Sequence, residues 1–372
     1  MIERYQTVIV GGGLVGMSIA FGMRALGARL AVLDDMDARS RPSRGNFGLV
    51  WVQGKGAGLT GYGAWTQASA RAWPRLAAQL LAETGIDVGL QCTGGLHACL
   101  SLAELKAREA HLHALFAQPG FEPHDLEMLD RDAIARRVPG IGSNVVGGSF
   151  CAQDAHCNPL RLLSALHAAA MHKGVVYRPR HRVRSIQPCS TGFVLEVPQG
   201  RIYAERLVLA AGIGNARLAP MVGMAAPLKA SKGQVIVLGR TRPMLPFPFE
   251  TIRQTDDGTL LIGSSREDRD DDALDQAVLG AMARRAIDML PALARLDVIR
   301  AWAALRVMSP DGGPVYAQSS THPGAFAIAC HSGVTLSAIH AFALAPALAQ
   351  GALPVQCATF SPARFADVLA AA

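Results

Sequence analysis

Glycines at fixed spacing near the start of the chain are the first residues whose types and spacing suit chemistry. The sequence GGGLVG at 11–16 follows the β-branched segment 7–10 and precedes an apolar, helix-like stretch. We expect Gly11 to allow a tight turn, Gly13 to let the backbone approach a pyrophosphate, and Gly16 to let a helix pack closely on a sheet. The free N–H groups and positive dipole end at the start of such a helix attract phosphate oxygens. The predicted dinucleotide site at this turn consists of Gly11, Gly13, Leu14, Val15 and Gly16.

An acidic pair follows the next apolar segment, 30–33. Asp34 lies 23 residues after Gly11, a spacing at which a carboxylate can accept hydrogen bonds from an adenosine ribose, and Asp35 stands beside it. An acid at this place disfavours a ribose that carries a 2′-phosphate, so NADP is not expected. The alternative is a glycine-rich turn that binds no ligand.

The segment after these acids distinguishes the two remaining dinucleotides, NAD and FAD. It is rich in small and polar residues from Ser43 to Gly56, where an NAD enzyme usually continues its alternating strands and helices. A loop of this kind can run beside a pyrophosphate and a flavin, so we expect FAD, and an ordinary surface loop is the alternative. Small residues also end the expected strand 207–210. The cofactor residues expected from these two segments are Ser43, Arg44, Asn46, Phe47, Gly48, Leu49, Ala211 and Gly212.

Such a motif needs a sheet to carry it, and the apolar pattern supplies the other elements. Helices are expected at about 65–83, 102–115, 158–173 and 273–290, with a last long helix after 335. Further strands are expected at 175–177, 182–186, 193–197, 207–210, 235–238, 249–254, 260–263, 298–308 and 326–330. We therefore predict a mixed α/β (α+β) fold, in which a Rossmann-like domain carries an inserted antiparallel-sheet domain.

The length of 372 residues and an apolar fraction of 50% are enough for two lobes. We assign 1–60, 140–225 and 310–372 to a discontinuous FAD-binding domain of the glutathione-reductase type. We assign 61–139 and 226–309 to a domain for substrate or partners.

The charge of the chain is basic, with a formal net value of +7 at pH 7. Four arginines alternate at 178, 180, 182 and 184, which would put them on one face of a strand. That face is either a solvated edge or a surface that docks a partner or steers anionic substrates. No nucleic-acid motif accompanies the charge, so nucleic acid is not an expected partner.

Cysteine usage and apolar runs exclude several classes of protein. None of the seven cysteines forms a CxxC pair, so we expect no metal or iron–sulfur site and reduced thiols in a cytoplasmic protein. Glycines break the apolar start, and no cleavage pattern follows, so no signal peptide is expected. His340 and Pro346 interrupt the late apolar run 338–355, which argues against a transmembrane segment.

Taken together, five segments resemble the D-amino acid oxidase (DAO) superfamily of FAD-dependent oxidoreductases over essentially the whole chain. They are the turn 11–16 with Asp34, the loop 43–46, the run 210–212, the stretch 305–312 around Arg306, and the loop 331–335. Glycine oxidase and sarcosine oxidase look similar in order and length. Segments 43–56, 93–97, 252–255 and 331–335 look closer to the β subunits of hetero-oligomeric dehydrogenases for opines (octopine, nopaline) or D-hydroxyproline. Hydrogen cyanide synthase, which oxidises glycine, is a relative.

This resemblance implies three catalytic candidates. Arg306 matches the arginine that holds the substrate carboxylate in glycine oxidase, and a guanidinium suits a carboxylate bidentately; a structural salt bridge is the alternative. His331 is either a flavin neighbour or a structural histidine, and Glu250, like His97, is either a pocket residue or a buried or partner-facing one. The remaining residues expected at the cofactor are Val183, Ser332, Gly333, Val334 and Thr335.

The implied reaction is oxidation of the carbon–nitrogen bond of an amino-acid-like secondary amine, by hydride transfer to flavin N5. The flavin is expected to be bound without a covalent link, because 307–310 lacks the cysteine that tethers it in monomeric sarcosine oxidases. The β-subunit resemblance implies α and small electron-transfer subunits as partners, in the cytoplasm or at a membrane through those partners. Two alternatives stay open: a free-standing glycine-, sarcosine- or D-amino acid-type oxidase that uses oxygen, and a flavin-binding scaffold subunit without activity of its own.

Overall fold

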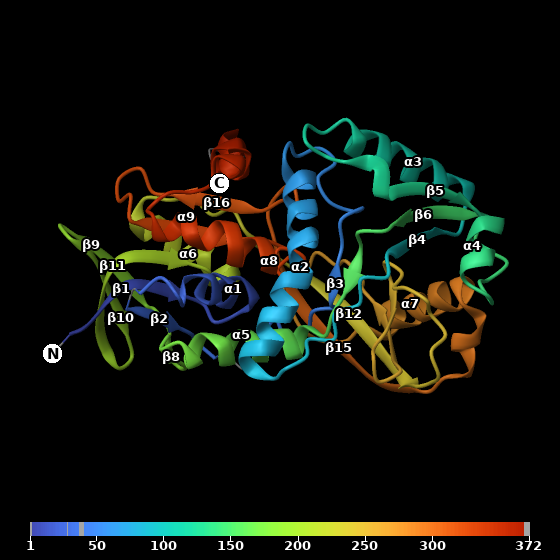
Figure 1. The fold of residues 1–372 in the computed structure, drawn as a ribbon, viewed down its shortest axis with the longest axis horizontal. Helices are drawn as coiled ribbons and strands as arrows, with labels where there is room; N and C mark the ends of the chain where they lie inside the picture. The colour runs from blue at the N-terminus through green and yellow to red at the C-terminus, as the bar shows by residue number, and fades with distance from the viewer. Residues whose placement is uncertain (1, 28, 37–40, 368–372) are drawn as a thin grey trace.

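The chain folds into two lobes that lie side by side along its longest axis (Figure 1). This computed structural model describes residues 2–27, 29–36 and 41–367. One lobe carries the first strands and the last helices, and the second carries α3 (Leu102–Phe116), α4 (Arg131–Arg137) and α7 (Gln276–Met289). The long helix α2 (Tyr62–Thr84) runs between them (Figure 1).

A mainly parallel sheet forms the centre of the first lobe. Its strand order is β16-β17-β11-β1-β2-β8, and only the edge pair β16–β17 in this order is antiparallel. The strands are β1 (Glu3–Val10), β2 (Leu30–Leu33), β8 (Val176–Arg178), β11 (Gly200–Leu209), β16 (Val315–Gln318) and β17 (Ala325–Ala329). Two antiparallel strands, β9 (Ser185–Cys189) and β10 (Gly192–Val197), extend the sheet from β11. Because carboxyl ends of parallel strands meet at one edge, the segments after β1, β2, β11 and β17 converge there.

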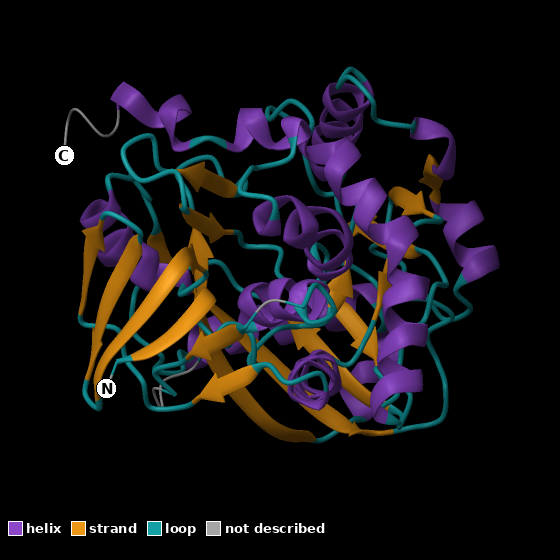
Figure 2. Ribbon diagram, turned by 60° about the vertical axis from the view of Figure 1, so that its left-hand side comes forward, coloured by secondary structure: helices purple, strands orange, loops and turns teal. Residues whose placement is uncertain are grey.

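Helices cover this sheet, as the purple ribbons of Figure 2 show. They include α1 (Leu14–Met23), α5 (Pro159–His172), and a last helix that runs through α8 (Ser337–Ile339), a π-helical segment (His340–Leu344) and α9 (Ala345–Ala349). The expected cap of α5 is present, because Asn158 Oδ1 accepts from the N–H groups of Leu160 and Arg161. A Cβ on Gly22 of α1 would fall 2.2 Å from the carbonyl oxygen of Ala341, so glycine allows α1 to touch the last helix.

The second lobe is built on antiparallel sheets. The larger has the order β13-β14-β12-β15, with β12 (Lys229–Arg240), β13 (Ile252–Gln254), β14 (Thr259–Gly263) and β15 (Val298–Met308). A three-stranded sheet joins β4 (Gly95–Cys99), β6 (Gly147–Cys151) and β5 (Leu126–Asp130). A two-stranded sheet pairs β3 (Leu49–Val50) with β7 (Ala155–His156).

The hydrophobic cores show how the two lobes divide the chain. Buried residues of α2, such as Trp73 and Leu76, share one core cluster with α1, α5 and the last helix. Strand β6, in contrast, pairs with β4 and β5 of the second lobe. We therefore propose a division into two domains with shifted bounds. Helix α2, assigned from sequence to the second domain, packs in the FAD-binding domain, and β6, assigned to the FAD-binding domain, belongs to the second domain.

The expected mixed α/β fold is confirmed, and the expected helices and most of the expected strands are present. Strand β16 and the sheet of β4, β5 and β6 were not anticipated. The four alternating arginines are a correction: Arg178 ends β8, Arg180 lies in a turn with φ of 58°, and Arg182 and Arg184 precede β9. Pro179, which has no N–H and a fixed φ, ends the strand pattern, so these arginines do not share a strand face.

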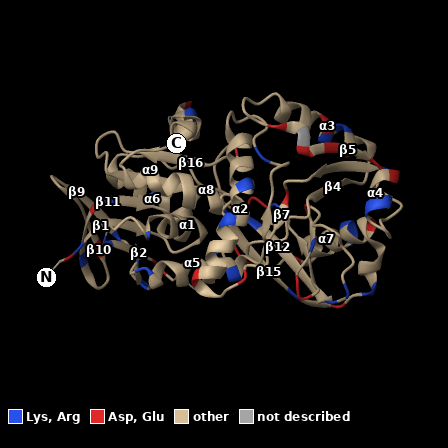
Figure 3. Ribbon diagram, viewed as in Figure 1, with Lys and Arg blue, Asp and Glu red and all other residues tan. Residues whose placement is uncertain are grey.

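Basic and acidic residues are interspersed along both lobes (Figure 3). Within the part of the chain that the structure describes, no helix combines the length and apolar character needed to cross a membrane.

Candidate functional site

A cavity of about 590 Å³ takes its walls from both lobes. One wall consists of the segments that leave the carboxyl edge of the parallel sheet, at 10–15, 33–35, 210–214 and 328–335. The other wall comes from the loop 41–55 and from residues of β12 and β15. Placement at the carboxyl edge of a parallel sheet is the usual position of a ligand site in such folds.

Backbone groups form the floor of the cavity at the glycine-rich turn. The N–H of Gly11 donates to the Leu33 carbonyl at 2.8 Å, and the N–H of Leu14 donates to Ser43 Oγ at 3.0 Å. Gly11 has φ of 115°, and a Cβ there would fall 2.3 Å from the Ala210 oxygen. The turn therefore has no room for side chains and presents bare backbone to the cavity, which suits a dinucleotide pyrophosphate.

Asp34 is buried at the end of β2 and lines the same cavity. Its Oδ2 accepts from the N–H of Gly12 at 2.6 Å, and its Oδ1 accepts from the N–H of Met36 at 2.6 Å. Arg41 Nη1 lies 2.5 Å from Oδ1. The carboxylate thus fixes the glycine-rich turn directly, a role that sequence spacing alone did not reveal.

A second small-residue turn follows β11. The side chain of Asn215 accepts from the N–H of Ala211 and donates to the carbonyls of Leu209 and Ile328, so it ties the ends of β11 and β17 together. Gly212 there has φ of 59°, a conformation that favours glycine. Val183 also lines the cavity, and its carbonyl accepts from Arg217 Nη2 at 2.7 Å.

The loop 331–335 closes the cavity beside the first turn of α1. Ser332 Oγ lies 2.9 Å from the Tyr62 hydroxyl, and Thr335 Oγ1 accepts from the N–H of Trp51 at 3.1 Å. Burial and the positive charges of Lys55 and Arg306 hold the pKa of His331 well below its usual range, so the ring is neutral at pH 7.

Arg306 points from β15 toward the cavity, and its guanidinium is held by uncharged acceptors. It donates to the Lys232 carbonyl at 3.2 Å, and to Ser264 Oγ and the Ser265 carbonyl at 2.6 Å each. A Cβ on Gly233 would fall 2.2 Å from Arg306 Nη2, so only glycine leaves room for the guanidinium. Burial, with the charge of Arg266, lowers the pKa of Arg306 to about 10, which still leaves it charged at pH 7.

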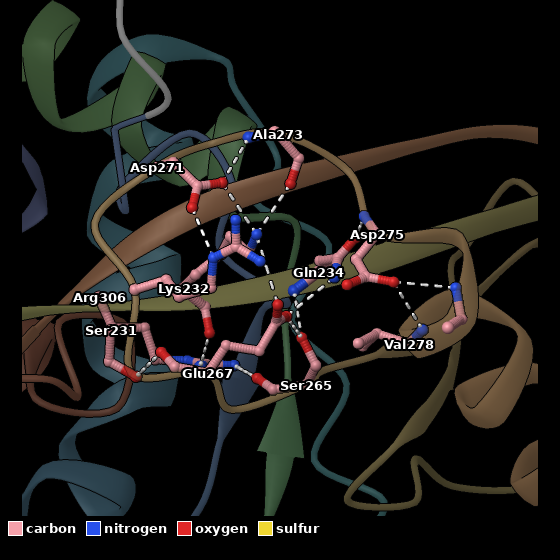
Figure 4. Close-up of polar contacts among 12 residues, drawn as sticks. Ser231, Lys232, Gln234, Ser265, Glu267, Asp271, Ala273, Asp275, Val278 and Arg306 are labelled. Atoms are coloured by element: carbon pink, nitrogen blue, oxygen red, sulfur yellow. Dashed lines mark hydrogen bonds and ion pairs between the residues drawn. The ribbon is translucent and has the colours of Figure 1, made fainter.

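A polar cluster behind Arg306 fixes the loop that carries its acceptors (Figure 4). The buried Lys232 ammonium lies 3.0 Å from Asp271 Oδ1 and 3.4 Å from Glu267 Oε2. Glu267 Oε1 accepts from Ser265 Oγ and from Gln234 Nε2. The acids near Arg306 are therefore engaged by Lys232, and Arg306 forms no ion pair with an acid of the described residues.

Glu250 faces the cavity from the second lobe, and its side chain stays 46% accessible. Its Oε2 lies 2.5 Å from His97 Nδ1. Partial desolvation in the cavity wall would by itself raise the pKa of Glu250, but the hydrogen bond from His97 and the charges of Arg108 and Lys55 lower it to about 2. A carboxylate that is paired with His97 thus lines the same cavity as two cations, Arg306 and Lys55.

A buried network supports the loop beneath this charged wall. Asp154 Oδ1 accepts from the N–H of Val52 at 2.6 Å, and Asp154 Oδ2 accepts from Gln53 Nε2 at 2.6 Å. Arg108 donates to Gln53 Oε1 at 2.7 Å and to Ser149 Oγ at 2.7 Å. Burial raises the pKa of Asp154 to about 7 even though its neighbours donate hydrogen bonds to it.

Most of the expected site residues meet at this cavity, and three do not line it. Gly16 lies behind the turn, where a Cβ would fall 1.9 Å from the Gly11 oxygen, which matches its expected packing role. Arg44 is exposed, and Gly48 is buried against the Cys157 carbonyl. Trp51 and Lys55 line the cavity without having been expected there, although glycines on both sides of Lys55 were an available signal of a turn at a ligand site.

This geometry has a counterpart in a family of known proteins. Residues 6–347 match the family model described as DAO, FAD dependent oxidoreductase. The chain belongs to this family. The backbone cradle, the acid at the end of β2 and the cavity between the lobes fit FAD, so the expected cofactor is confirmed.

Relatives of the chain agree with this assignment. It is 46% identical to the B subunit of opine oxidase from Agrobacterium tumefaciens, over 96% of each chain. It is 45% identical to the B subunit of opine oxidase from Rhizobium meliloti, again over 96% of each. Among solved structures, glycine oxidase from Geobacillus kaustophilus superimposes with a TM-score of 0.86 at 23% identity, covering 96% of this chain and 98% of that one. The expected subgroup resemblance is therefore confirmed, and this flavoprotein is closer to these opine oxidase subunits than to the glycine oxidase.

The Asp154 network makes a prediction about stability. In Asp154→Asn, an NH₂ group would face either the Val52 N–H or Gln53 Nε2, so one buried donor would lose its acceptor. We expect the free energy of unfolding to fall by about 1–3 kcal/mol, the usual cost of an unsatisfied buried polar group. Denaturant unfolding of the flavin-loaded protein measures this, with exposed Asp297→Asn as control. Equal stability of the two variants would contradict the role given to Asp154.

Proposed function

We propose that this chain oxidises the carbon–nitrogen bond of an amino-acid-like secondary amine, of the opine or D-hydroxyproline type. The observation that carries the proposal is Arg306, a charged guanidinium at the cavity whose hydrogen bonds within the described chain go to a hydroxyl and two carbonyls. Such a group suits a substrate carboxylate. The identity of 46% to the B subunit of an opine oxidase supports the opine type.

The protein groups contribute binding and orientation around the cofactor. FAD, held without a covalent link, would supply the hydride acceptor, flavin N5, for the hydrogen on the substrate carbon beside nitrogen. Arg306 anchors the carboxylate and so orients that carbon. Neutral His331 offers a hydrogen-bonding group without adding charge, and Glu250 faces the substrate end of the cavity. These roles of Arg306, His331 and Glu250 belong to the proposal.

The cofactor contacts also belong to the proposal. The N–H groups of the turn 11–16 that donate to no protein acceptor hold the pyrophosphate, and Asp34 accepts from the ribose with the one lone pair that its three protein contacts leave free. The loop 332–335 lies beside the same turn, because a Cβ on Gly333 would meet Leu14 and Val15 at 3.6 and 3.8 Å. We propose that its backbone contacts the flavin.

Anaerobic reduction tests the activity. The purified flavoprotein is mixed without oxygen with octopine, nopaline, D-hydroxyproline, sarcosine or glycine, and the flavin absorbance is recorded. We expect an opine or D-hydroxyproline to bleach the flavin, with sarcosine and glycine much slower. Bleaching by none of the panel would contradict the proposal and favour a scaffold subunit. Rapid peroxide formation on admitting air would identify an oxidase that uses oxygen directly.

Substitution of Arg306 tests the anchoring role. In Arg306→Lys we expect kcat/KM for the best carboxylate substrate to fall by about 30- to 1000-fold, because a lysine would lose the three hydrogen bonds that orient the guanidinium beside the substrate. The FAD content should stay near that of the unchanged protein. Arg300→Lys, on the same strand but exposed, is the matched control and should keep full activity. Unchanged kcat/KM in Arg306→Lys would show that Arg306 is structural.

The subunit names of the relatives motivate a proposal about partners. We propose that the chain is the β subunit of a larger cytoplasmic dehydrogenase, with α and small electron-transfer subunits that take the electrons onward. We expect co-expression with neighbouring reading frames to yield a stable complex, in which an electron acceptor is reduced faster than by this chain alone. A monomer that consumes oxygen at full rate would contradict the subunit assignment and leave the flavoenzyme assignment intact.

A further inference from the structure

Lys55 is a cation of the cavity lining to which the proposed function gives no role. It lies in a turn between Gly54 and Gly56, and it lines the cavity together with Arg306, Glu250 and His331. Among the residues that the structure describes, its ammonium has no hydrogen bond or ion pair within contact distance. A cation that is enclosed in a cavity without a counterion is costly, so such a group usually serves a ligand.

A second donor in the same wall also lacks a partner. Trp51 lines the cavity and is 4% exposed, yet its Nε1 is buried without an acceptor in the described chain. The indole packs on Gly54, because a Cβ there would fall 3.2 Å from Trp51 Nε1. Protein atoms enclose this N–H, so the indole packs beside the turn that presents Lys55 and its N–H does not face the cavity.

The position of Lys55 is fixed by the buried network below it. Asp154 accepts from the N–H of Val52, and the N–H of Lys55 donates to the Val52 carbonyl at 3.0 Å. Gln53, between them, is held by Asp154 and Arg108. The turn is thus anchored on the protein side, which is the arrangement expected of a preorganised binding group.

One acid, Glu250, acts on Lys55 without forming an ion pair with it. Glu250 is the negative group that acts on it, but that carboxylate is already paired with His97 at 2.5 Å. Burial, together with the positive charges of Arg266 and Arg306, lowers the pKa of Lys55 to about 8. The pKa would rise again if an anion came to rest beside the ammonium.

We propose that Lys55 forms a second anion subsite, and that the cavity selects a secondary amine with a carboxylate on each side of its nitrogen. One carboxylate binds Arg306 and the other binds Lys55, so the N–H lies between them. This inference rests on the proposed function for the Arg306 end only. A subsite for a second carboxylate would favour opine-type dicarboxylates over sarcosine, proline-like and glycine substrates, which carry a single carboxylate.

Two ligand pairs isolate the second carboxylate. The first pair is iminodiacetate and sarcosine, two amines that differ only in the second carboxylate. The second pair is glutarate and butyrate, their redox-inert analogues, in which a CH₂ replaces the N–H. Titration of the flavin-loaded protein with glutarate and butyrate, followed by the flavin spectrum, gives Kd values without turnover. We expect glutarate to bind more tightly than butyrate. In Lys55→Met the Kd of glutarate should rise by about 10- to 100-fold, as for a lost desolvated charge pair, with butyrate changed less than about threefold.

Control variants show whether the positive charge at position 55 causes the preference for glutarate. Lys55→Arg keeps the charge and should keep most of that preference, and exposed Lys106→Met on α3 should change neither Kd. Equal weakening of both ligands in Lys55→Met would mean that Lys55 only balances Glu250, and would overturn the subsite. Loss of FAD, or a changed spectrum without ligand, would make Lys55 a cofactor contact and overturn it as well. The subsite would also be overturned if the unchanged protein bound glutarate no more tightly than butyrate.

Turnover separates this inference from the proposed function. Iminodiacetate should reduce the flavin with a lower KM than sarcosine, and Lys55→Met should raise the KM of iminodiacetate alone. If neither amine nor any opine reduces the flavin while the preference for glutarate persists, the proposed function fails and the subsite stands. If both amines reduce it with equal KM before and after the substitution, the subsite fails and the proposed function stands.

Discussion

The backbone of Gly11 lies so close to the end of β11 that a Cβ on Gly11 would overlap the Ala210 carbonyl. This approach joins the first turn of the chain to a strand from its second half, and it brings the ends of β1, β2 and β11 to one place. Because no side chain fits there, the cavity floor consists of N–H groups and small residues. A dinucleotide can then lie directly on the backbone, and Asp34 holds the turn open from the neighbouring strand.

The opposite wall, which carries Arg306 and Lys55, is distinguished by its charged side chains. Arg306 and Lys55 come from segments that are far apart in sequence, and the acids close to them are engaged elsewhere: Glu267 by Lys232, and Glu250 by His97. Pairing of the acids with other groups leaves net positive charge facing the cavity. Glu250 compensates the charge of Lys55 only in part, so an anionic substrate would gain further electrostatic energy at this wall.

The first wall was predictable from sequence, and much of the second was not. The turn 11–16, Asp34 and the elements around them follow local rules, in which spacing and residue type determine the backbone. Arg306 was found through a family resemblance. Lys55, Trp51 and Asp154 were missed because their environment depends on contacts over long separations, such as Val52 with Asp154. The prediction that the alternating arginines from 178 to 184 share one strand face was wrong for a local reason, because Pro179 ends the strand that the pattern assumed.

The two walls also explain how one fold can serve different amines. The glycine oxidase structure shares the fold at 23% identity, as expected if the backbone cradle needs little beyond glycine and small residues at a few positions. The charged wall rests instead on side chains, and each one depends on a supporting network of its own: the Lys232 cluster for Arg306, and the Asp154 network for the turn of Lys55. If the proposed roles of Arg306 and Lys55 hold, changing a charge on that wall would alter substrate choice without loss of the cofactor site.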